Sequence, residues 1–160
     1  MIHFPTSISV EIEALNVTSV AFKDHEFIPV KYTCDGDNTN PPLTIQNISF
    51  ETKSLVVIVE DPDAPIRAWV HWMAWDIPPA TKIKERFAPA LGVIGVNDFR
   101  KKKYVGPCPP SGTHRYFFKV YALDDLIKLK PTATKLELER AMSSHIIGFG
   151  ELVGLYKRTQ

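Results

Sequence analysis

The stretch Leu55-Val56-Val57-Ile58-Val59 is followed by Asp61-Pro62-Asp63-Ala64-Pro65 and then by Trp69-Val70-His71. A continuous apolar run rich in β-branched residues predicts a buried central strand. The aromatic-rich segment Trp69–Ile77 predicts a second strand beyond the proline-containing turn. The fold is therefore expected to form around this strand, turn and strand, with polar side chains at the turn.

Further strands are predicted on both sides of this unit. Apolar and polar residues alternate over Ile8–Glu13, which is the period of a half-buried strand. Strands are also predicted at Arg115–Leu123 and Glu151–Lys157, with a weaker strand signal at Val17–Phe22. Pro29–Tyr32 is predicted to be a short extended segment. The stretch Cys34–Pro42 is expected to be a loop, because it combines Asp-Gly, asparagines and a double proline.

One helix is predicted late in the chain. Thr134 and Glu137 fit a capping box, and Leu138, Ala141, Met142, His145 and Ile146 follow helical spacing. Gly148 is expected to be the C′ residue that ends this helix. We therefore predict a mostly β protein with one late helix, folded as a single domain over residues 1–160.

Composition excludes several classes of protein. The 160 residues include 19 Lys and Arg against 18 Asp and Glu, so charge gives no reason to expect nucleic-acid binding. No apolar run approaches the roughly 18 residues of a membrane span, so membrane insertion is not expected. A hydrophobic fraction of 44% is typical of a folded globular chain.

The cysteines and the N-terminus bear on the compartment. Cys34 and Cys108 are the two cysteines, and a single disulfide between them is possible. The N-terminal residues lack the basic and apolar regions of a signal peptide. We therefore expect a cytoplasmic protein in which both thiols are reduced.

A second turn-rich segment, Gly106–Tyr116, supplies further pocket-lining candidates. Side chains two apart on a strand share a face, so His114 and Tyr116 are expected to point the same way. By the same rule Trp69 and His71 share a face, which Met73 and Trp75 should continue.

Asp61 is expected to end the apolar column of Val57 and Val59 at the rim of the sheet. Asp63 follows it across Pro62. An aspartate next to an imidazole would orient the ring and favour its protonated form. Imidazole N–H groups and the Tyr116 hydroxyl can donate to the oxygens of a small anion such as phosphate.

Other interpretations of these residues stay open. Asp61 and Asp63 could make turn hydrogen bonds, and the histidines could be packed structural residues. Asp61, His71 and His114 could form a two-histidine, one-carboxylate metal site. Cys108 could be a thiol nucleophile with His114 as its base. His145 is expected to be structural, and Arg100–Lys103 a solvated loop.

These segments resemble the phosphatidylethanolamine-binding protein family, which includes the Raf kinase inhibitor proteins. The matching motifs are Asp61–Pro65, Trp69 with His71, and Gly106–Tyr116, together with an early loop from Tyr32 to Leu43. The similarity runs from about Phe27 to Tyr156. The short loop before His114 and the end of the chain at Gln160 are similar to the compact bacterial and archaeal branch.

The resemblance implies a large antiparallel sheet packed against a smaller one. It also implies a small pocket for phosphate, phosphoryl headgroups or similar anions. Carried over by motif, the pocket residues are Asp61, Trp69, His71, Cys108, Pro109, His114 and Tyr116, and Asp63 belongs to the same motif.

Together, the residues and the resemblance predict non-enzymatic binding of a small anion or phosphoryl headgroup. The protein is also expected to be able to regulate a partner protein. No cofactor and no metal are expected. The alternatives are a serine protease or kinase inhibitor acting through a surface loop, and a metal-dependent hydrolase using Asp61, His71 and His114. A monomer or a homodimer is compatible with exposed strand edges.

Overall fold

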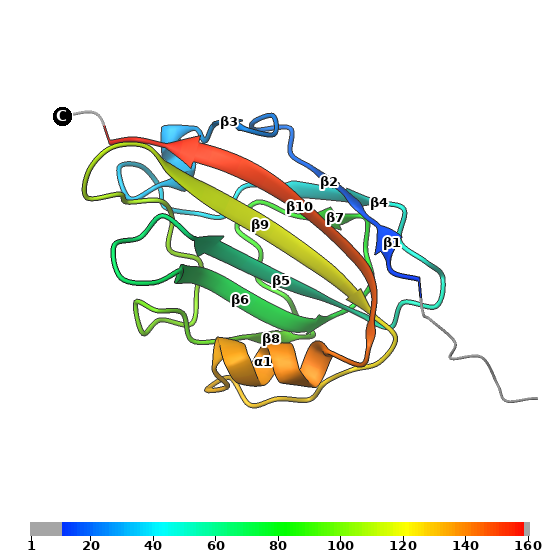
Figure 1. Cartoon of the computed structure of the whole chain (residues 1–160). Coiled ribbons are helices and arrows are strands. Elements are labelled where there is room, and N and C mark those ends of the chain that lie inside the picture. The colour runs from blue at the N-terminus through cyan, green and yellow to red at the C-terminus, as the bar shows by residue number, and fades with distance from the viewer. Residues whose placement is uncertain (1–10, 159–160) are drawn as a thin grey trace, which may run out of the picture.

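A computed structural model describes residues 11–158 of the chain, shown in Figure 1. Two β-sheets and one α-helix make up the molecule. The larger sheet has the strand order β1-β10-β9-β5-β6-β8, with β3 also paired to β10, and the smaller sheet has the order β2-β4-β7. The elements are β1 Glu13–Ala14, β2 Asn16–Thr18, β3 Glu26–Phe27, the 3₁₀ helix η1 Val30–Tyr32, β4 Leu43–Gln46, β5 Ser54–Asp61, β6 Trp69–Ile77, β7 Lys82–Ile83, β8 Val93–Ile94, β9 His114–Leu123, α1 Lys135–Met142 and β10 Ile146–Tyr156.

The predicted class, a large sheet with a smaller sheet and one late helix, is confirmed. The large sheet is antiparallel except at β10, where the short strands β1 and β3 pair in parallel. These two strands come from the N-terminal chain, which passes along the free edge of β10 in the same direction. Gly150 permits this approach, because a Cβ there would lie 2.3 Å from the Leu15 carbonyl oxygen.

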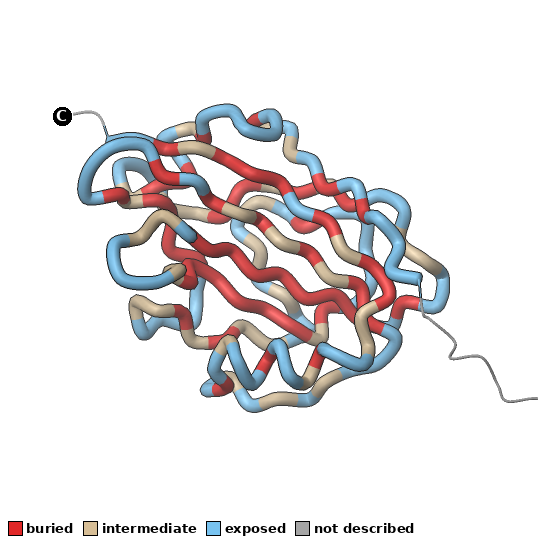
Figure 2. The backbone as a smooth tube through the Cα atoms, in the orientation of Figure 1, coloured by how far each residue is buried: buried red, intermediate tan, exposed pale blue. Residues whose placement is uncertain are grey.

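The central strand β5 is buried along its whole length. Figure 2 colours this strand as buried. Its two faces pack into different clusters. Val57 and Val59 belong to the larger core on the side of the small sheet. Val56 and Ile58 pack on the opposite side, against Leu138 and Met142 of α1. An apolar run without alternation is therefore explained by burial on both faces.

The helix begins as predicted and ends earlier. Thr134 caps α1 and forms both hydrogen bonds of the capping box with Glu137. The helix stops at Met142, and Ile146 already pairs with Leu123 as the first residue of β10. The prediction of Gly148 as a C′ residue is therefore wrong, because the β-branched Ile146-Ile147 pair starts a strand instead.

A buried carboxylate anchors the helix to the sheet. Glu60 on β5 is 5% exposed and bonds to the ammonium groups of Lys119 on β9 and Lys135 on α1. Burial acts to raise the pKa of Glu60, but the two lysines outweigh it, so the pKa lies below its usual value. A buried charge of this kind is tolerated because both partners neutralise it.

Several other segments differ from expectation. Pro29–Tyr32 contains the 3₁₀ turn η1 and is not extended, and β3, β4, β7 and β8 were not predicted. Half of the predicted strand Ile8–Glu13, residues 8–10, lies outside the described residues. Glu11 and Ile12 are not in a strand, and Glu13 is the first residue of β1. Short strands such as β7 and β8 have two residues each, too few to produce a periodic signal.

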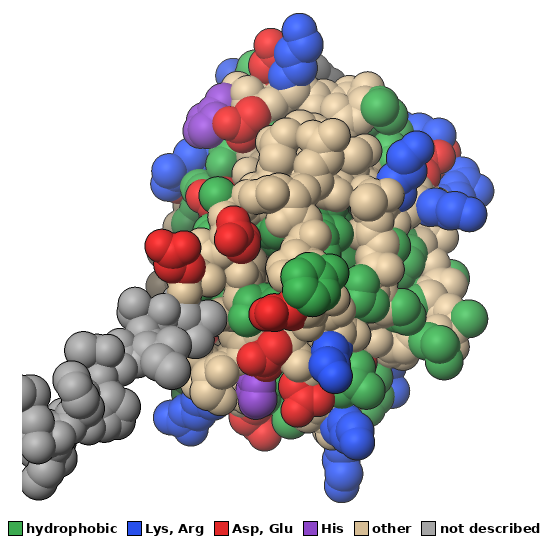
Figure 3. All heavy atoms as spheres, turned by 90° about the vertical axis from the view of Figure 1, so that its right-hand side faces the viewer, with side chains coloured by type: hydrophobic (Ala, Val, Ile, Leu, Met, Phe, Trp, Pro, Cys, Tyr) green, Lys and Arg blue, Asp and Glu red, His purple; other side chains and the backbone are tan. Residues whose placement is uncertain are grey.

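The α-helix found in residues 11–158 has eight residues, which falls far short of the length that a bilayer-spanning helix needs. Figure 3 shows the end of the molecule that lies on the right in Figure 1. There, basic and acidic side chains lie side by side among hydrophobic and polar atoms, so no patch of one sign of charge stands out.

Candidate functional site

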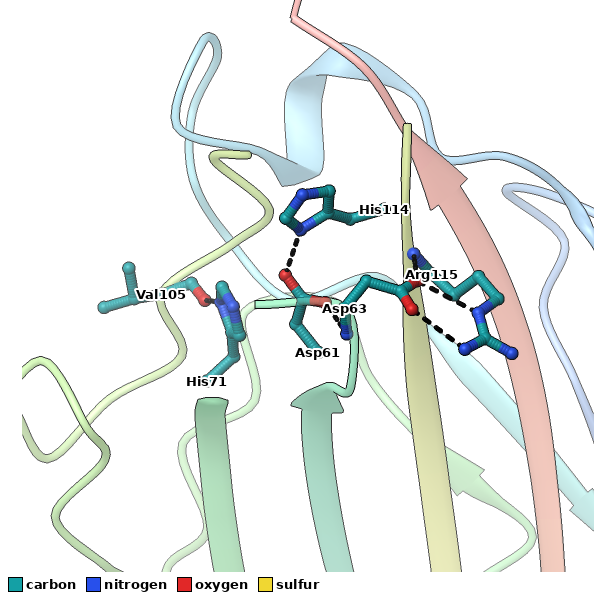
Figure 4. Close-up of polar contacts among 6 residues, drawn as sticks. All are labelled: Asp61, Asp63, His71, Val105, His114 and Arg115. Carbon is teal, nitrogen blue, oxygen red and sulfur yellow. Dashed lines mark hydrogen bonds and ion pairs between the residues drawn. The ribbon is translucent and has the colours of Figure 1, made fainter. Parts of the chain in front are cut away.

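Three strand ends meet at one edge of the large sheet. Asp61 is the last residue of β5, Trp69 the first of β6 and His114 the first of β9. Because β5 runs antiparallel to both neighbours, its last residue lies next to the first residues of β6 and β9. The two motifs, in which Asp61 and His114 are 53 residues apart, are therefore brought together, as Figure 4 shows.

A β-bulge in β6 aims His71 toward this edge. Val59 pairs with Trp72 and Glu60 pairs with Val70, which leaves His71 as the extra residue. The bulge shifts the alternation of side chains along β6. Met73 therefore packs in the cluster under the helix, as does Trp75, instead of continuing the face of His71. The predicted shared face of Trp69 and His71 is found, but its extension to Met73 and Trp75 is wrong.

His114 forms a buried pair with Asp61. Its Nδ1 lies 2.6 Å from Asp61 Oδ2, and the side chains are 10% and 6% exposed. The other carboxylate oxygen, Oδ1, accepts a hydrogen bond from the Asp63 backbone N–H at 2.8 Å. The carboxylate is thereby fixed from both sides, and a donating Nδ1–H leaves Nε2 as the free nitrogen of His114.

His71 is held by the backbone of a loop. Its Nδ1 lies 2.6 Å from the Val105 carbonyl oxygen, which can only accept, so Nδ1 carries the proton. Burial lowers the pKa of His71 below its usual 6.5, although the Val105 carbonyl and the charge of Asp61 act in the opposite direction. The ring is therefore neutral at pH 7, with Nε2 as an acceptor.

Tyr116 lies beside both imidazoles. Its ring centroid is 5.3 Å from that of His71 and 6.5 Å from that of His114. Burial, followed by the nearby Asp61 carboxylate, raises the pKa of Tyr116, so the hydroxyl keeps its proton. This hydroxyl is buried beside the Asp61 carboxylate and the Cys108 backbone, without a hydrogen bond of good geometry to either. A buried donor without a good partner is uncommon in proteins, and a group bound in the cavity could accept from it.

These side chains line a cavity of about 180 Å³. Seven of the predicted residues contribute to it: Asp61, Trp69, His71, Cys108, Pro109, His114 and Tyr116. Ala64, Pro65 and Pro110 also line it and lie within the two segments predicted to be pocket lining, whereas Phe99 lies outside both segments. Phe99 packs edge-on against the rings of Trp69 and His71, and no motif marked it because it comes from a separate loop.

Asp63 points away from the cavity. Its carboxylate accepts from the guanidinium of Arg115 at 2.8 and 3.0 Å and from the Arg115 backbone N–H at 2.9 Å. These hydrogen bonds lower the pKa of Asp63 to about 2. The predicted site residue Asp63 therefore ties the turn after β5 to the start of β9 and does not line the cavity.

The two cysteines form a disulfide. Cys34 and Cys108 are bonded across a sequence separation of 74 residues, with Cα atoms 5.4 Å apart. The expectation that both thiols are reduced is therefore wrong, because the folded chain brings the loop before Pro42 against the loop that carries Cys108. The same contact includes a hydrogen bond from the Cys34 N–H to the Pro107 carbonyl. Cys108 thus has no free thiol for nucleophilic chemistry.

The metal hypothesis gains no geometric support. Asp61, His71 and His114 line one cavity. Within residues 11–158, however, no group of three or more His, Cys, Asp or Glu side chains has an arrangement that could hold a metal ion. Both Nδ1 atoms are already bonded to protein oxygens.

Comparison with known proteins identifies the family of the chain. Residues 18–157 match the family model described as phosphatidylethanolamine-binding protein. A UPF0098 protein of Pyrococcus horikoshii is 53% identical over 155 residues, which cover 91% of this chain and 77% of the relative. A UPF0098 protein of Methanothermobacter thermautotrophicus is 45% identical over 90% of this chain and 99% of the relative.

Two solved structures have the same fold. A phosphatidylethanolamine-binding protein homologue from Chlamydia trachomatis is 39% identical with a TM-score of 0.87, covering 92% of this chain and 99% of its own. YbcL of E. coli, described as a member of the mammalian family, is 31% identical with a TM-score of 0.84, covering 91% and 99%. On the family match and these relatives, the chain belongs to the phosphatidylethanolamine-binding protein family.

Proposed function

We propose that the cavity formed by β5, β6 and β9 binds a small anion, such as phosphate or a phosphorylated headgroup, without catalysing a reaction. The carrying observation is that two buried imidazoles and the unpartnered hydroxyl of Tyr116 line one cavity of about 180 Å³. A cavity of this size suits a phosphoryl group better than a large substrate. The family is not a known enzyme family, which agrees with a binding role.

The imidazoles make binding depend on protons. In the neutral ring of His71, Nδ1–H donates to Val105 and Nε2 has only a lone pair. In a neutral ring of His114 whose Nδ1–H donates to Asp61, Nε2 is likewise an acceptor, and only the protonated ring donates from both nitrogens. An anion oxygen needs a donor, so either the ring takes up a proton or the ligand brings one. We therefore propose that the preferred ligand is a singly charged phosphate or phosphomonoester, which still carries an O–H.

Tyr116 and Asp61 supply the other polar groups that would act on a ligand in the cavity. The Tyr116 hydroxyl supplies one donor that is independent of pH in the neutral range. Asp61 contributes one negative charge near the cavity and repels a ligand with a high negative charge. The other walls, including Trp69, Phe99 and Pro109, are apolar and strengthen the few polar contacts by excluding water.

The test is a titration of phosphate and O-phosphoethanolamine followed by NMR of the histidine ring nitrogens. We expect saturable shifts of the His71 and His114 signals with both ligands. His114→Gln should weaken binding about tenfold or more, because a charge-assisted hydrogen bond contributes about 1.5–3 kcal/mol.

His145→Gln is the matched control for this titration. His145 has the same kind of contact, with Nδ1 2.8 Å from Asp124 Oδ1, but it is partly exposed and does not line the cavity. Its replacement should leave affinity unchanged. Equal binding by the His114 and His145 variants would overturn the proposal, as would the absence of any shift in the His71 and His114 signals.

Inhibition of a protein partner is the second candidate, favoured by one observation. Ile66 is 96% exposed and follows Ala64 and Pro65, which line the cavity. An exposed apolar side chain on a turn offers a contact for a protease or kinase. Assays against chymotrypsin, subtilisin and elastase test the protease form of this role. Inhibition that Ile66→Asp abolishes and His114→Gln preserves would support it, and no inhibition would remove it.

A further inference from the structure

The disulfide between Cys34 and Cys108 lies at the wall of the anion cavity. Cys108 lines this cavity together with Pro109 and Pro110, whereas Cys34 does not. The bond therefore joins the cavity wall to a loop outside the cavity, 74 residues earlier in the chain. Both cysteines are half-buried and lie in loops, so the bond is not sealed within the core.

The loop that carries Cys34 is firmly anchored. Asp35, the next residue, accepts hydrogen bonds from the Tyr156 hydroxyl at 2.7 Å and from the Arg158 guanidinium at 2.9 Å. Tyr156 is the last residue of β10, so these bonds tie the loop to the large sheet. Thr33, on the other side of Cys34, is fully buried. Cys34 is therefore a fixed point to which the cavity wall is attached.

The chain just before Cys108 is held by hydrogen bonds of its own. Residues 105–107 each make one such bond through the backbone. In chain order, their partners are the carbonyl of His71 at 3.2 Å, the side-chain oxygen of Asn38 at 2.7 Å and the N–H of Cys34 at 3.1 Å. These residues are thus supported whether or not the disulfide is closed.

The chain just after Cys108 lacks this support. Within residues 11–158, no backbone hydrogen bond holds residues 109–113 before β9 begins at His114. Pro109 and Pro110 have no N–H to donate. Around Gly112 the structure is open, with no atom within 4 Å of the position that a Cβ would take. The disulfide is therefore the last cross-link before a segment that contributes two prolines to the cavity wall.

The position of this segment affects the cavity directly. Its prolines form part of the apolar wall, and the hydroxyl of Tyr116 lies beside the Cys108 backbone. With the disulfide closed, the wall has its shape before a ligand arrives. With the disulfide open, residues 108–113 gain conformational freedom, and a ligand has to order them again. Such ordering lowers affinity.

We propose that the Cys34–Cys108 bond is a redox switch of the anion cavity, which binds its anion more tightly when the bond is oxidised than when it is reduced. This inference rests on the proposed anion-binding function. The co-reactant is a dithiol, of which one thiolate attacks a cysteine sulfur and breaks the S–S bond. The second thiol of the reductant then resolves the mixed disulfide. The reductant leaves as a disulfide, and the protein gains two electrons and two protons as two thiols.

The switch has to work in both directions. If reduction weakens anion binding by a given factor, a saturating anion makes the disulfide harder to reduce by the same factor. We expect a factor of about five, since only a short loop has to be ordered on binding. A factor of five in the equilibrium constant corresponds to about 20 mV in the reduction potential of this two-electron couple.

The test is a titration of inorganic phosphate at pH 7, followed by NMR of the histidine ring signals. The samples are the oxidised wild type, the wild type reduced with dithiothreitol, and the double variant Cys34→Ser, Cys108→Ser. We expect the last two to bind about fivefold more weakly than the first. Dithiothreitol should not change the affinity of the double variant. Equilibration of the wild type in dithiothreitol redox buffers, with and without phosphate, should show the same fivefold shift.

Thr134→Ala is the control for a general loss of stability. It removes the cap of α1, which does not line the cavity, and should keep the affinity of the oxidised wild type. Folded and unfolded chains exchange slowly and give separate signals, so the affinity of the folded reduced chain is measured even where part of the sample unfolds.

The outcomes separate the switch from the function on which it rests. Equal affinity of the oxidised and reduced wild type would overturn the switch alone. A reduced chain that is entirely unfolded would also overturn it, because the bond would then be purely structural. No saturable binding to the oxidised protein would overturn the proposed function and the switch with it.

Discussion

At the scale of single residues, the environment decides what a histidine does. His114 and His145 both contact an aspartate through Nδ1, but the first pair is buried at a cavity and the second lies at the surface. A surface pair of this kind contributes about 0–1 kcal/mol and is screened by salt. The sequence already predicts that His145 is structural, and the fold adds that its pair with Asp124 lies at the surface, away from the cavity.

The lowered pKa of His71 predicts a pH dependence of anion binding. The pKa lies below 6.5, so the ring is neutral at pH 7 and takes up a proton only at lower pH. An anion stabilises the protonated ring, so affinity should rise as the pH falls through this range. Sulfate is the suitable probe, because it carries no titrating proton there. Calorimetric titrations between about pH 5 and 8 should show this rise, which His71→Gln should reduce; an affinity independent of pH would contradict it.

Asp63 predicts a separate pH dependence, of stability. Its pKa is lowered to about 2 by Arg115, whereas an unfolded aspartate titrates near about 3.9. Stability from this pair is therefore present above about pH 4 and is lost as the pH falls toward 2. Urea unfolding at several acidic pH values should show a smaller loss for Asp63→Asn and for Arg115→Gln than for the wild type. Equal losses in all three proteins would rule this contribution out.

At the scale of elements, how well a strand or helix can be predicted depends on its length and on the strands that pair with it. β5, β6 and β9 were predicted closely, because their long apolar segments are specific to buried strands. The bulge at His71 was not predictable, because it depends on how β6 pairs with β5. The helix end was misjudged for a similar reason, since pairing with Leu123 draws Ile146 into β10.

The helix cap predicts a modest change in stability. The Thr134 hydroxyl oxygen accepts from the Glu137 backbone N–H at 3.1 Å. The Glu137 carboxylate in turn accepts from the Thr134 backbone N–H. Thr134→Ala should lower the free energy of unfolding by about 1 kcal/mol. Thr132→Ala, an exposed neighbour before the helix, should change it far less. Urea unfolding measures both, and a Thr134 variant as stable as the Thr132 variant would argue against the cap.

The disulfide predicts a larger effect. It closes a long loop, and removing such a cross-link typically lowers the free energy of unfolding by about 2–4 kcal/mol. We expect this loss when Cys34 and Cys108 are both changed to serine. Phosphine reductant should reproduce it in the wild type and have no effect on the double variant. Unchanged stability after verified reduction would show that the bond is dispensable.

At the scale of the whole molecule, two cavities surround the start of the bulged strand β6. His71 lines the smaller cavity and Trp72, its neighbour, lines the larger. The sequence motifs located the first cavity, because they place polar side chains at strand ends. They did not predict the second, whose walls come from five separate segments, although one of these, Asp37–Asn40, lies in the early loop that resembles the family. The expectation of two reduced thiols was wrong, since two cysteines alone fix neither pairing nor compartment.

The measurement that tests the central claim most directly is the phosphate titration of wild type, His114→Gln and His145→Gln, followed by the histidine ring signals. We predict saturable binding to the wild type and the His145 variant, with about tenfold or greater weakening in the His114 variant. Equal affinity in all three proteins, or no saturable shift of His71 and His114, would contradict an anion site in this cavity.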